Sequence, residues 1–232
     1  IPTKALLKSA QVFDYVNHSE NYGIKISKSS VDFDSIISRS RGVADGMSKG
    51  VNFLMKKNKI DILNGFGKII SKNEVEVTTE ENKKEIHKSD NIIIATGGRS
   101  RELPNLKIDN KKVIEYRKAM TLEKQPKKMV VVGSGAIGSE FAYFYNSIGT
   151  EVILVEYLPN ILPLEDIDVS KQLEKSFKKA GVNIMTNTEV LSVDTKGKGC
   201  KVKYKSGDKE EIIDCDIVLS AVGVQTNVDN IG

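Results

Sequence analysis

The sequence predicts an α/β protein whose domain combines a parallel sheet with a three-stranded antiparallel meander. It also predicts part of a second domain of the same design. Three observations indicate this class. From Lys127 onward, apolar runs of strand length alternate with helical patterns. Short alternating runs joined by polar turns come next. An earlier part of the chain then resembles the end of this one, which predicts two domains built alike.

The composition is that of a globular chain, and it excludes several function classes. Of the 232 residues, 39% are hydrophobic and 28% are charged, with a net charge of +4. The lysines lie in mixed-charge stretches and aromatics are few, so no nucleic-acid partner is expected. The longest apolar runs are too short to span a membrane. Two cysteines, Cys200 and Cys215, match neither a metal nor a disulfide framework, which favours a cytoplasmic location and no metal site.

The first hundred residues predict two helices followed by short strands. Residues 4–21 carry apolar positions at helical spacing, and Gly23 provides a stop. A second helix follows the Ser and Asp caps of KISKSSVDFDS and ends near Lys57. Its expected apolar face comprises Phe33, Ile37, Val43, Met47, Val51 and Leu54. The strand candidates after it are DILNGFGKII, EVEVTT, KEIHK and NIIIATGG, the last expected to be buried.

The second part of the chain predicts a β-α-β-α-β unit. Residues 100–126 hold two of the five prolines and are expected to be an irregular connection. MVVVG, EVILVE and VNIMTN are strand candidates. Between them lie the helical stretches GSGAIGSEFAYFYNSIG and DIDVSKQLEKSFKKAG, the latter amphipathic through Val169, Leu173 and Phe177. This order builds a parallel sheet.

An internal repeat defines the expected domain boundaries. Three short strands and a buried strand end in Ala95-Thr96-Gly97 in one copy and in Ala221-Val222-Gly223 in the other. Residues 1–99 are therefore expected to be a partial domain and 127–224 a complete one. Residues 100–126 connect them, and 225–232 return toward the first domain. The first copy has no glycine-rich turn, so we expect a strand, such a turn and a helix before Ile1.

VVVGSGAIGSEF contains the G-x-G-x-x-G pattern in a strand–turn–helix context. Gly133 permits the sharp turn, Gly135 allows backbone to approach a pyrophosphate, and Gly138 allows close packing of helix and sheet. The exposed N–H groups and dipole at the helix start favour an anion. The pattern predicts a Rossmann-like dinucleotide-binding domain.

Two acidic residues accompany this turn. Glu156 ends EVILVE, 23 residues after Gly133, where a carboxylate accepts hydrogen bonds from ribose hydroxyls. A 2′-phosphate there would meet a like charge, and no Arg follows within YLPNILP, so NAD is favoured over NADP. Glu140 lies in the first turn of the helix, where its charge compensates the helix dipole.

The segments IPTKALL, ATGGRSRELPNL, GSGAIGSEFAYFY, VEYLPNILPLED and DIVLSAVG resemble flavoprotein disulfide reductases that bind two dinucleotides, and among them the dihydrolipoamide dehydrogenases. The resemblance covers the whole chain. It implies a redox cysteine pair ending directly before Ile1, so that no catalytic residue lies in this chain. It also implies an FAD-binding turn further upstream and a dimerisation domain after Gly232.

The resemblance further implies two sets of binding residues. Those for FAD are Lys4, Gly67, Thr96, Gly97 and Gly98. Those for NAD are Gly133, Ser134, Gly135, Ala136, Ile137, Gly138, Glu140, Glu156, Val190 and Gly223. From the residues alone, Lys4 is preferably a solvated lysine at the start of a helix, and Val190 is equally a plain strand residue.

In the implied reaction, electrons pass from dihydrolipoamide through the cysteine pair and FAD to NAD. The implied partners are the lipoyl domain of a 2-oxoacid dehydrogenase complex and a second copy of the parent, which would be a homodimer. This chain alone is expected to be inactive and to retain FAD weakly or not at all. Two alternatives stay open: another pyridine nucleotide-disulfide oxidoreductase of the mercuric or glutathione type, and a non-catalytic dinucleotide-binding module.

Overall fold

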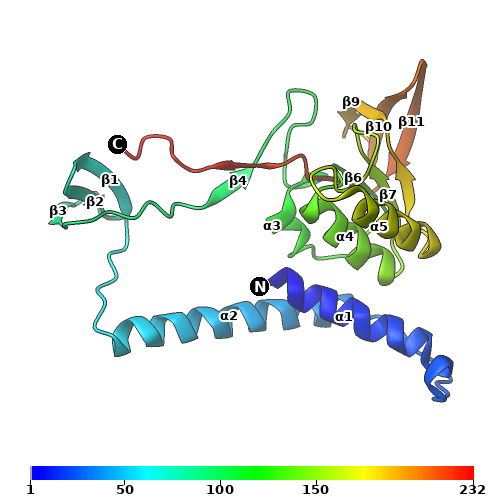
Figure 1. Cartoon of the computed structure of the whole chain (residues 1–232), viewed down its shortest axis with the longest axis horizontal. Coiled ribbons are helices and arrows are strands. Elements are labelled where there is room, and N and C mark those ends of the chain that lie inside the picture. Colours follow the sequence, from blue (N-terminus) through cyan, green and yellow to red (C-terminus); the bar gives the residue numbers. More distant parts are fainter. Residues whose placement is uncertain (1) are drawn as a thin grey trace. The chain divides into compact units, whose positions relative to one another are not determined.

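The computed structural model describes residues 2–232 and divides the chain into two compact units. Unit 1 comprises Ile1–Ala44 and Ser100–Gly223. Unit 2 comprises Asp45–Arg99 and Val224–Gly232. Each unit is described by itself below. Figure 1 labels the α-helices and most of the strands.

Unit 1 is built on a five-stranded sheet with the order β5-β12-β6-β7-β8, in which every neighbouring pair is parallel. The expected β-α-β-α-β unit is confirmed. It comprises β6 (Lys128–Val132), α4 (Ala136–Ser147), β7 (Glu151–Val155), α5 (Ile167–Lys179) and β8 (Asn183–Met185). The strand β12 (Ile217–Ser220) then inserts beside β6, as a parallel crossover requires.

The apolar run of β6 is buried on both faces of the sheet. Met129 and Val131 pack into a helical layer with Phe141 of α4, whereas Val130 and Val132 pack into a second core. Alternate side chains of one strand thus serve both cores, because successive side chains point to opposite faces. On α5, Val169 is 53% exposed, so the expectation that it faces the core is wrong; the buried residues there are Ser170 and Phe177.

The second core lies under the expected meander, which is confirmed as an antiparallel sheet. Its strands are β9 (Thr188–Asp194), β10 (Cys200–Ser206) and β11 (Lys209–Cys215), coloured from gold to orange-red in Figure 1. Inward and outward side chains alternate along β10, where Cys200, Val202 and Tyr204 are buried. This period of two matches a sheet with one solvated face.

The N-terminal helix α1 (Pro2–Asn17) buries Leu6 and Ala10 completely and packs on α4. It ends earlier than expected, because Ser19–Tyr22 form a separate 3₁₀ turn (η1). Gly23 ends that turn with a φ of 73°, the left-handed geometry that glycine adopts without strain.

The long helix α2 (Phe33–Lys57) has the expected length, but its apolar stripe is not uniformly buried. Phe33 is buried within unit 1, where Arg39 donates to the backbone oxygen of Ala5 at 2.9 Å. The stripe then becomes exposed: Val43, Met47, Val51 and Leu54 retain 37–51% of their accessible surface. The described residues supply no cover for these four side chains.

Residues 100–126 are not an irregular connection. They contribute β5 (Val113–Ile114), a fully buried strand at one edge of the parallel sheet, and the short helix α3 (Tyr116–Ala119). The correction has a physical reason: β12 is apolar on both faces, and pairing with β5 covers its free edge. The sequence signal was weak, since a two-residue strand has no periodicity.

Unit 2 contains a three-stranded antiparallel sheet of β1 (Phe66–Ser71), β2 (Glu74–Thr78) and β3 (Lys84–Lys88). A short ribbon joins β4 (Gly98–Ser100) to β13 (Val224–Thr226). The prediction of a buried strand at NIIIATGG is wrong. Residues 91–97 form no strand in the described chain, and Ile93 and Ile94 are 89% and 56% exposed, because no described strand pairs with this apolar segment.

Candidate functional site

The glycine-rich turn leaves β6 at Gly133 and enters α4 at Gly135. Gly133 has a φ of 96°, and a side chain there would lie 2.5 Å from the backbone oxygen of Ala221. Its own N–H donates to the oxygen of Val155 at 2.8 Å, which holds the turn against β7. Both the dihedral angle and the close approach of β12 therefore require glycine.

The next two glycines of the pattern have different surroundings. A side chain on Gly138 would lie 1.9 Å from the backbone oxygen of Gly133, so this glycine allows α4 to approach the turn. A side chain on Gly135 would meet nothing within 4 Å. Gly135 is also the N-cap of α4 and provides no side-chain hydrogen bond to the helix. The first N–H groups of α4 are thus available to an anion above an open surface.

Glu156 follows β7 and is 7% exposed. Its Oε2 accepts hydrogen bonds from the N–H of Ser134 at 2.9 Å and from the hydroxyl of Ser134 at 2.7 Å. Its Oε1 accepts from the N–H of Leu158 at 2.9 Å. Three donors therefore fix the carboxylate beside the glycine turn, with acceptor capacity remaining on Oε1.

These residues line one cavity of about 650 Å³. It brings together six of the residues expected to bind NAD: Gly133, Ser134, Gly135, Glu156, Val190 and Gly223. Gly223 has a φ of 117° and accepts a hydrogen bond from the N–H of Arg101 at 3.0 Å. Ala136 and Ile137 occupy the first turn of α4, outside the cavity lining.

Arg101 and Asn105 are among the cavity residues that sequence reasoning missed. Arg101 and Asn105 belong to the segment that was expected to be a mere connection, yet both line the cavity. Asn105 donates from Nδ2 to the backbone oxygen of Val190 at 2.5 Å and so fixes the strand β9 at the cavity wall. Arg101 adds a positive charge. No local pattern marks either residue, although RELPN is unusually polar for a spacer.

Glu140, also expected at the NAD site, lies outside this cavity and forms an ion pair with Lys4. The pair joins α4 to α1, and the side chains are 33% and 68% exposed. The structure therefore brings together one residue expected at the flavin and one expected at the nicotinamide.

Unit 2 holds a second, smaller cavity of about 300 Å³, lined by Gly67 and Thr96 among others. Gly97 and Gly98, the other residues expected at the flavin, are not among its lining residues. Gly97 has a φ of 72°, and a side chain on Gly98 would lie 2.7 Å from Val224. Gly97 therefore requires glycine for its backbone conformation, whereas Gly98 leaves room for the side chain of Val224.

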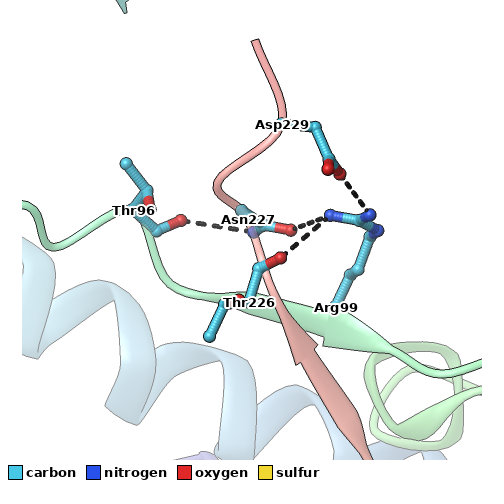
Figure 2. Close-up of polar contacts among 5 residues, drawn as sticks. All are labelled: Thr96, Arg99, Thr226, Asn227 and Asp229. Atoms are coloured by element: carbon cyan, nitrogen blue, oxygen red, sulfur yellow. Dashed lines mark hydrogen bonds and ion pairs between the residues drawn. The ribbon is translucent and has the colours of Figure 1, made fainter. Parts of the chain in front are cut away.

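Figure 2 shows how this loop is fastened to the C-terminal segment. The side-chain Nδ2 of Asn227 donates to the backbone oxygen of Thr96 at 3.2 Å. The backbone N–H of Asn227 donates to the backbone oxygen of Gly97 at 3.0 Å. The Arg99 guanidinium donates to Oδ1 of Asn227 at 2.9 Å and to Asp229 at 2.6 Å. A charged network thus fixes the Ala-Thr-Gly turn.

The part of the chain that the structure describes contains no cluster of three or more His, Cys, Asp or Glu suited to a metal ion. Among residues 2–232, no helix is long and apolar enough to cross a membrane.

The sequence profile of the pyridine nucleotide-disulphide oxidoreductases matches residues 1–231. The chain belongs to this family. The family assignment confirms the expected Rossmann-like α/β fold class and the resemblance on which the binding residues were named.

Individual members of the family narrow the comparison. The chain is 41% identical over 236 residues to a dihydrolipoyl dehydrogenase of Zymomonas mobilis, covering 100% of this chain and 50% of the relative. A mitochondrial dihydrolipoyl dehydrogenase of Pisum sativum is 36% identical, with coverages of 100% and 48%. A leghemoglobin reductase of Vigna unguiculata is 37% identical, with coverages of 96% and 43%. The chain thus spans about half the length of the curated relatives it matches.

Solved structures support the fold. LpdA of Mycobacterium tuberculosis superposes with a TM-score of 0.90 at 24% identity, over 100% of this chain and 50% of that one. The flavoprotein disulfide reductase RclA of Escherichia coli gives a TM-score of 0.81 at 24% identity, over 100% and 48%.

Proposed function

We propose that this oxidoreductase chain is part of a dihydrolipoyl dehydrogenase and contains its NAD-binding site. The observation that supports this most directly is the single cavity in which Glu156 faces the glycine turn of Gly133 and Gly135. The family assignment and the dihydrolipoyl dehydrogenase relatives agree with it.

The residues of the cavity fit a dinucleotide. The open surface above Gly135 has room for a pyrophosphate, to which the N–H groups of Ala136, Ile137 and Gly138 would donate. Glu156 would accept a ribose hydroxyl on Oε1, since its Oε2 is already occupied by Ser134. Val190, held by Asn105, would lie against the adenine, and Gly223 would leave space beside it.

Glu140 and Lys4 are proposed to act beyond the cavity lining, where the nicotinamide of NAD would meet a flavin. FAD, when bound to the intact protein, would accept electrons from a dithiol and pass a hydride to NAD. In unit 2, Gly67, Thr96, Gly97 and Gly98 are proposed to contact FAD, and the Arg99 network would keep their backbone in place.

The remaining parts of the proposal concern the intact protein. Its substrate would be dihydrolipoamide on the lipoyl domain of a 2-oxoacid dehydrogenase complex, and it would be a homodimer in the cytoplasm. The redox cysteines are proposed to precede Ile1, and both cysteines of the present chain are free. We therefore propose that the 232 residues alone oxidise no dihydrolipoamide and retain no FAD.

Titration calorimetry with NADH and NADPH tests the nucleotide proposal on this chain. We expect NADH to bind at least about tenfold more tightly, because a 2′-phosphate would approach the Glu156 carboxylate. If neither NADH nor NADPH binds, the proposed site is refuted. The visible absorption of the purified chain tests the flavin proposal, which requires colourless protein.

Arg101 favours one second candidate, an NADPH-dependent reductase of the glutathione type. Its guanidinium borders the same cavity as Glu156 and could neutralise a phosphate. Tighter binding of NADPH than of NADH would select this candidate over the dihydrolipoyl dehydrogenase.

A further inference from the structure

The two cysteines of the chain are 15 positions apart in sequence but directly opposite in the meander. Cys200 begins β10 and Cys215 ends β11, and the two are Cα partners in the antiparallel register. Both side chains are buried, at 1% and 7% exposure, on the inward face of the sheet. The sequence contains no third cysteine.

This placement suits a disulfide without movement of the backbone. Residues directly opposite in an antiparallel pair have Cα atoms about 4.5–5.5 Å apart. Disulfides span Cα separations of about 4.4–6.8 Å. The register of β10 and β11 therefore places the thiols within bonding range, and both are present as free thiols in the structure.

The surroundings make the two thiols chemically unequal. The Cys200 Sγ lies 3.8 Å from the backbone oxygens of Lys112 and Asp216. A hydrogen bond with Cys215 lowers the pKa of Cys200 and outweighs burial, which raises it. The Lys112 ammonium lowers this pKa as well, against the weaker opposing charges of Asp109 and Asp216. A hydrogen bond with Cys200, and then burial, raise the pKa of Cys215. Cys200 is thus the thiol that ionises first.

A cavity of about 420 Å³ borders the pair. Both cysteines line it, together with charged residues that include Lys198, Lys201 and Asp214. It shares no lining residue with the nucleotide cavity. A small polar oxidant, close to water in size, can enter such a cavity. A bulky oxidant such as a peptide disulfide would not reach thiols that are nearly fully buried.

We propose that Cys200 and Cys215 are a redox-active dithiol that hydrogen peroxide converts into a cross-strand disulfide. The Cys200 thiolate attacks one peroxide oxygen, the O–O bond breaks, and hydroxide leaves with the thiol proton as water. The Cys215 sulfur then attacks the resulting sulfenic acid, and the S–O bond breaks with loss of a second water. Two thiols are oxidised by two electrons, and one peroxide is reduced to two waters.

This modification is separate from the proposed nucleotide site. Val190, which lines the nucleotide cavity, pairs with Tyr204 of β10, four residues beyond Cys200 along the strand. A bond at Cys200 ties β10 to β11 at the end away from that cavity.

Intact-mass spectrometry of the 232-residue chain tests the proposal, because two cysteines permit only one intramolecular disulfide. After peroxide treatment and denaturing alkylation with iodoacetamide, we expect a loss of about 2 Da and no alkylated cysteine. Dithiothreitol should restore two alkylated cysteines. Two alkylated cysteines after peroxide, irreversible additions of oxygen, or covalent dimers would each overturn the proposal.

Single variants test the order of the steps. Cys215→Ser should stop at the sulfenic acid, a gain of about 16 Da that dimedone captures. Cys200→Ser should react at least about tenfold more slowly, since burial still raises the pKa of the remaining Cys215 thiol. Equal rates would overturn the assignment of Cys200 as the attacking thiol. The wild-type mass measurement holds even if either variant folds poorly.

Discussion

The ammonium of Lys4 on α1 contacts the carboxylate of Glu140 on α4, across 136 positions of sequence. The contact lies beside the completely buried side chains of Leu6 and Ala10, by which α1 packs against unit 1. Burial of apolar surface holds the two helices together, and the ion pair is partly solvated. The ion pair should therefore fix where the two charges lie and add little to the free energy of unfolding.

Lys4→Met should lower the free energy of unfolding by about 0.5 kcal/mol or less, because the lysine side chain is 68% exposed. Leu6→Ala, in the same helix, should lower it by about 3 kcal/mol through a cavity in the core. Urea denaturation measures both. A loss for Lys4→Met as large as that for Leu6→Ala would show that the ion pair is a main structural contact.

Gly135→Leu should abolish NADH binding in calorimetry and leave the melting temperature nearly unchanged, because its side chain enters open space above the turn. Gly197→Leu is a matched control, because its side chain also meets nothing within 4 Å. Gly197 lines the cavity beside Cys200 and Cys215, so NADH should still bind. Retained affinity in Gly135→Leu would exclude a pyrophosphate at this turn.

Gly138→Ala should act on the fold instead. Its Cβ would lie 1.9 Å from the backbone oxygen of Gly133, so α4 must move away from the sheet. We expect a loss of stability of about 2 kcal/mol or more, seen as a lower urea midpoint. A wild-type midpoint would mean that the helix can shift at little cost.

Glu156→Gln should reduce the preference for NADH over NADPH by about tenfold, because it removes the negative charge that opposes a 2′-phosphate. Ser134→Ala is the control, since it removes one hydrogen bond to the carboxylate and keeps the charge. Both variants are compared by titration with each nucleotide. An unchanged preference in Glu156→Gln would move the discrimination to another residue.

Asp109 should make folding stability depend on pH. Its Oδ1 accepts hydrogen bonds from the N–H groups of Lys111, Lys112 and Val113 ahead of β5. Burial raises the pKa of Asp109, but these three hydrogen bonds outweigh that effect and hold the pKa below its ordinary value. The carboxylate therefore stabilises the folded chain above the unfolded pKa, and this contribution disappears as the pH falls through the lower, folded pKa.

Asp109→Ala should accordingly cost about 1 kcal/mol of stability near pH 6, and the difference from the wild type should shrink below about pH 4. Urea denaturation at a series of pH values measures it. Asp208→Ala, at an exposed turn between β10 and β11, is the control for the removal of an acidic side chain. A difference that persists unchanged at pH 3 would assign the effect to packing.

Much of the parallel sheet was predictable because its signals are local. The run MVVV is apolar at every position, as a strand buried on both faces must be, and Gly133 to Gly138 mark a turn into a helix. The same assumption, that apolar residues are buried, gave the correct prediction for MVVV and the wrong ones for Val169 and residues 91–97. An apolar residue indicates burial only when another element covers it, and local sequence does not state which element does.

The sequence by itself determined the alternation of strands and helices, the glycine turn and the acidic residue at the end of β7, since each depends on neighbours within a few positions. The tertiary structure alone decided that Lys4 meets Glu140, that Arg101 and Asn105 border the nucleotide cavity, and that Cys200 faces Cys215. Those relationships depend on which strands pair and which helices pack. Such choices are made by burial and hydrogen bonding summed over the whole fold, which no short segment encodes.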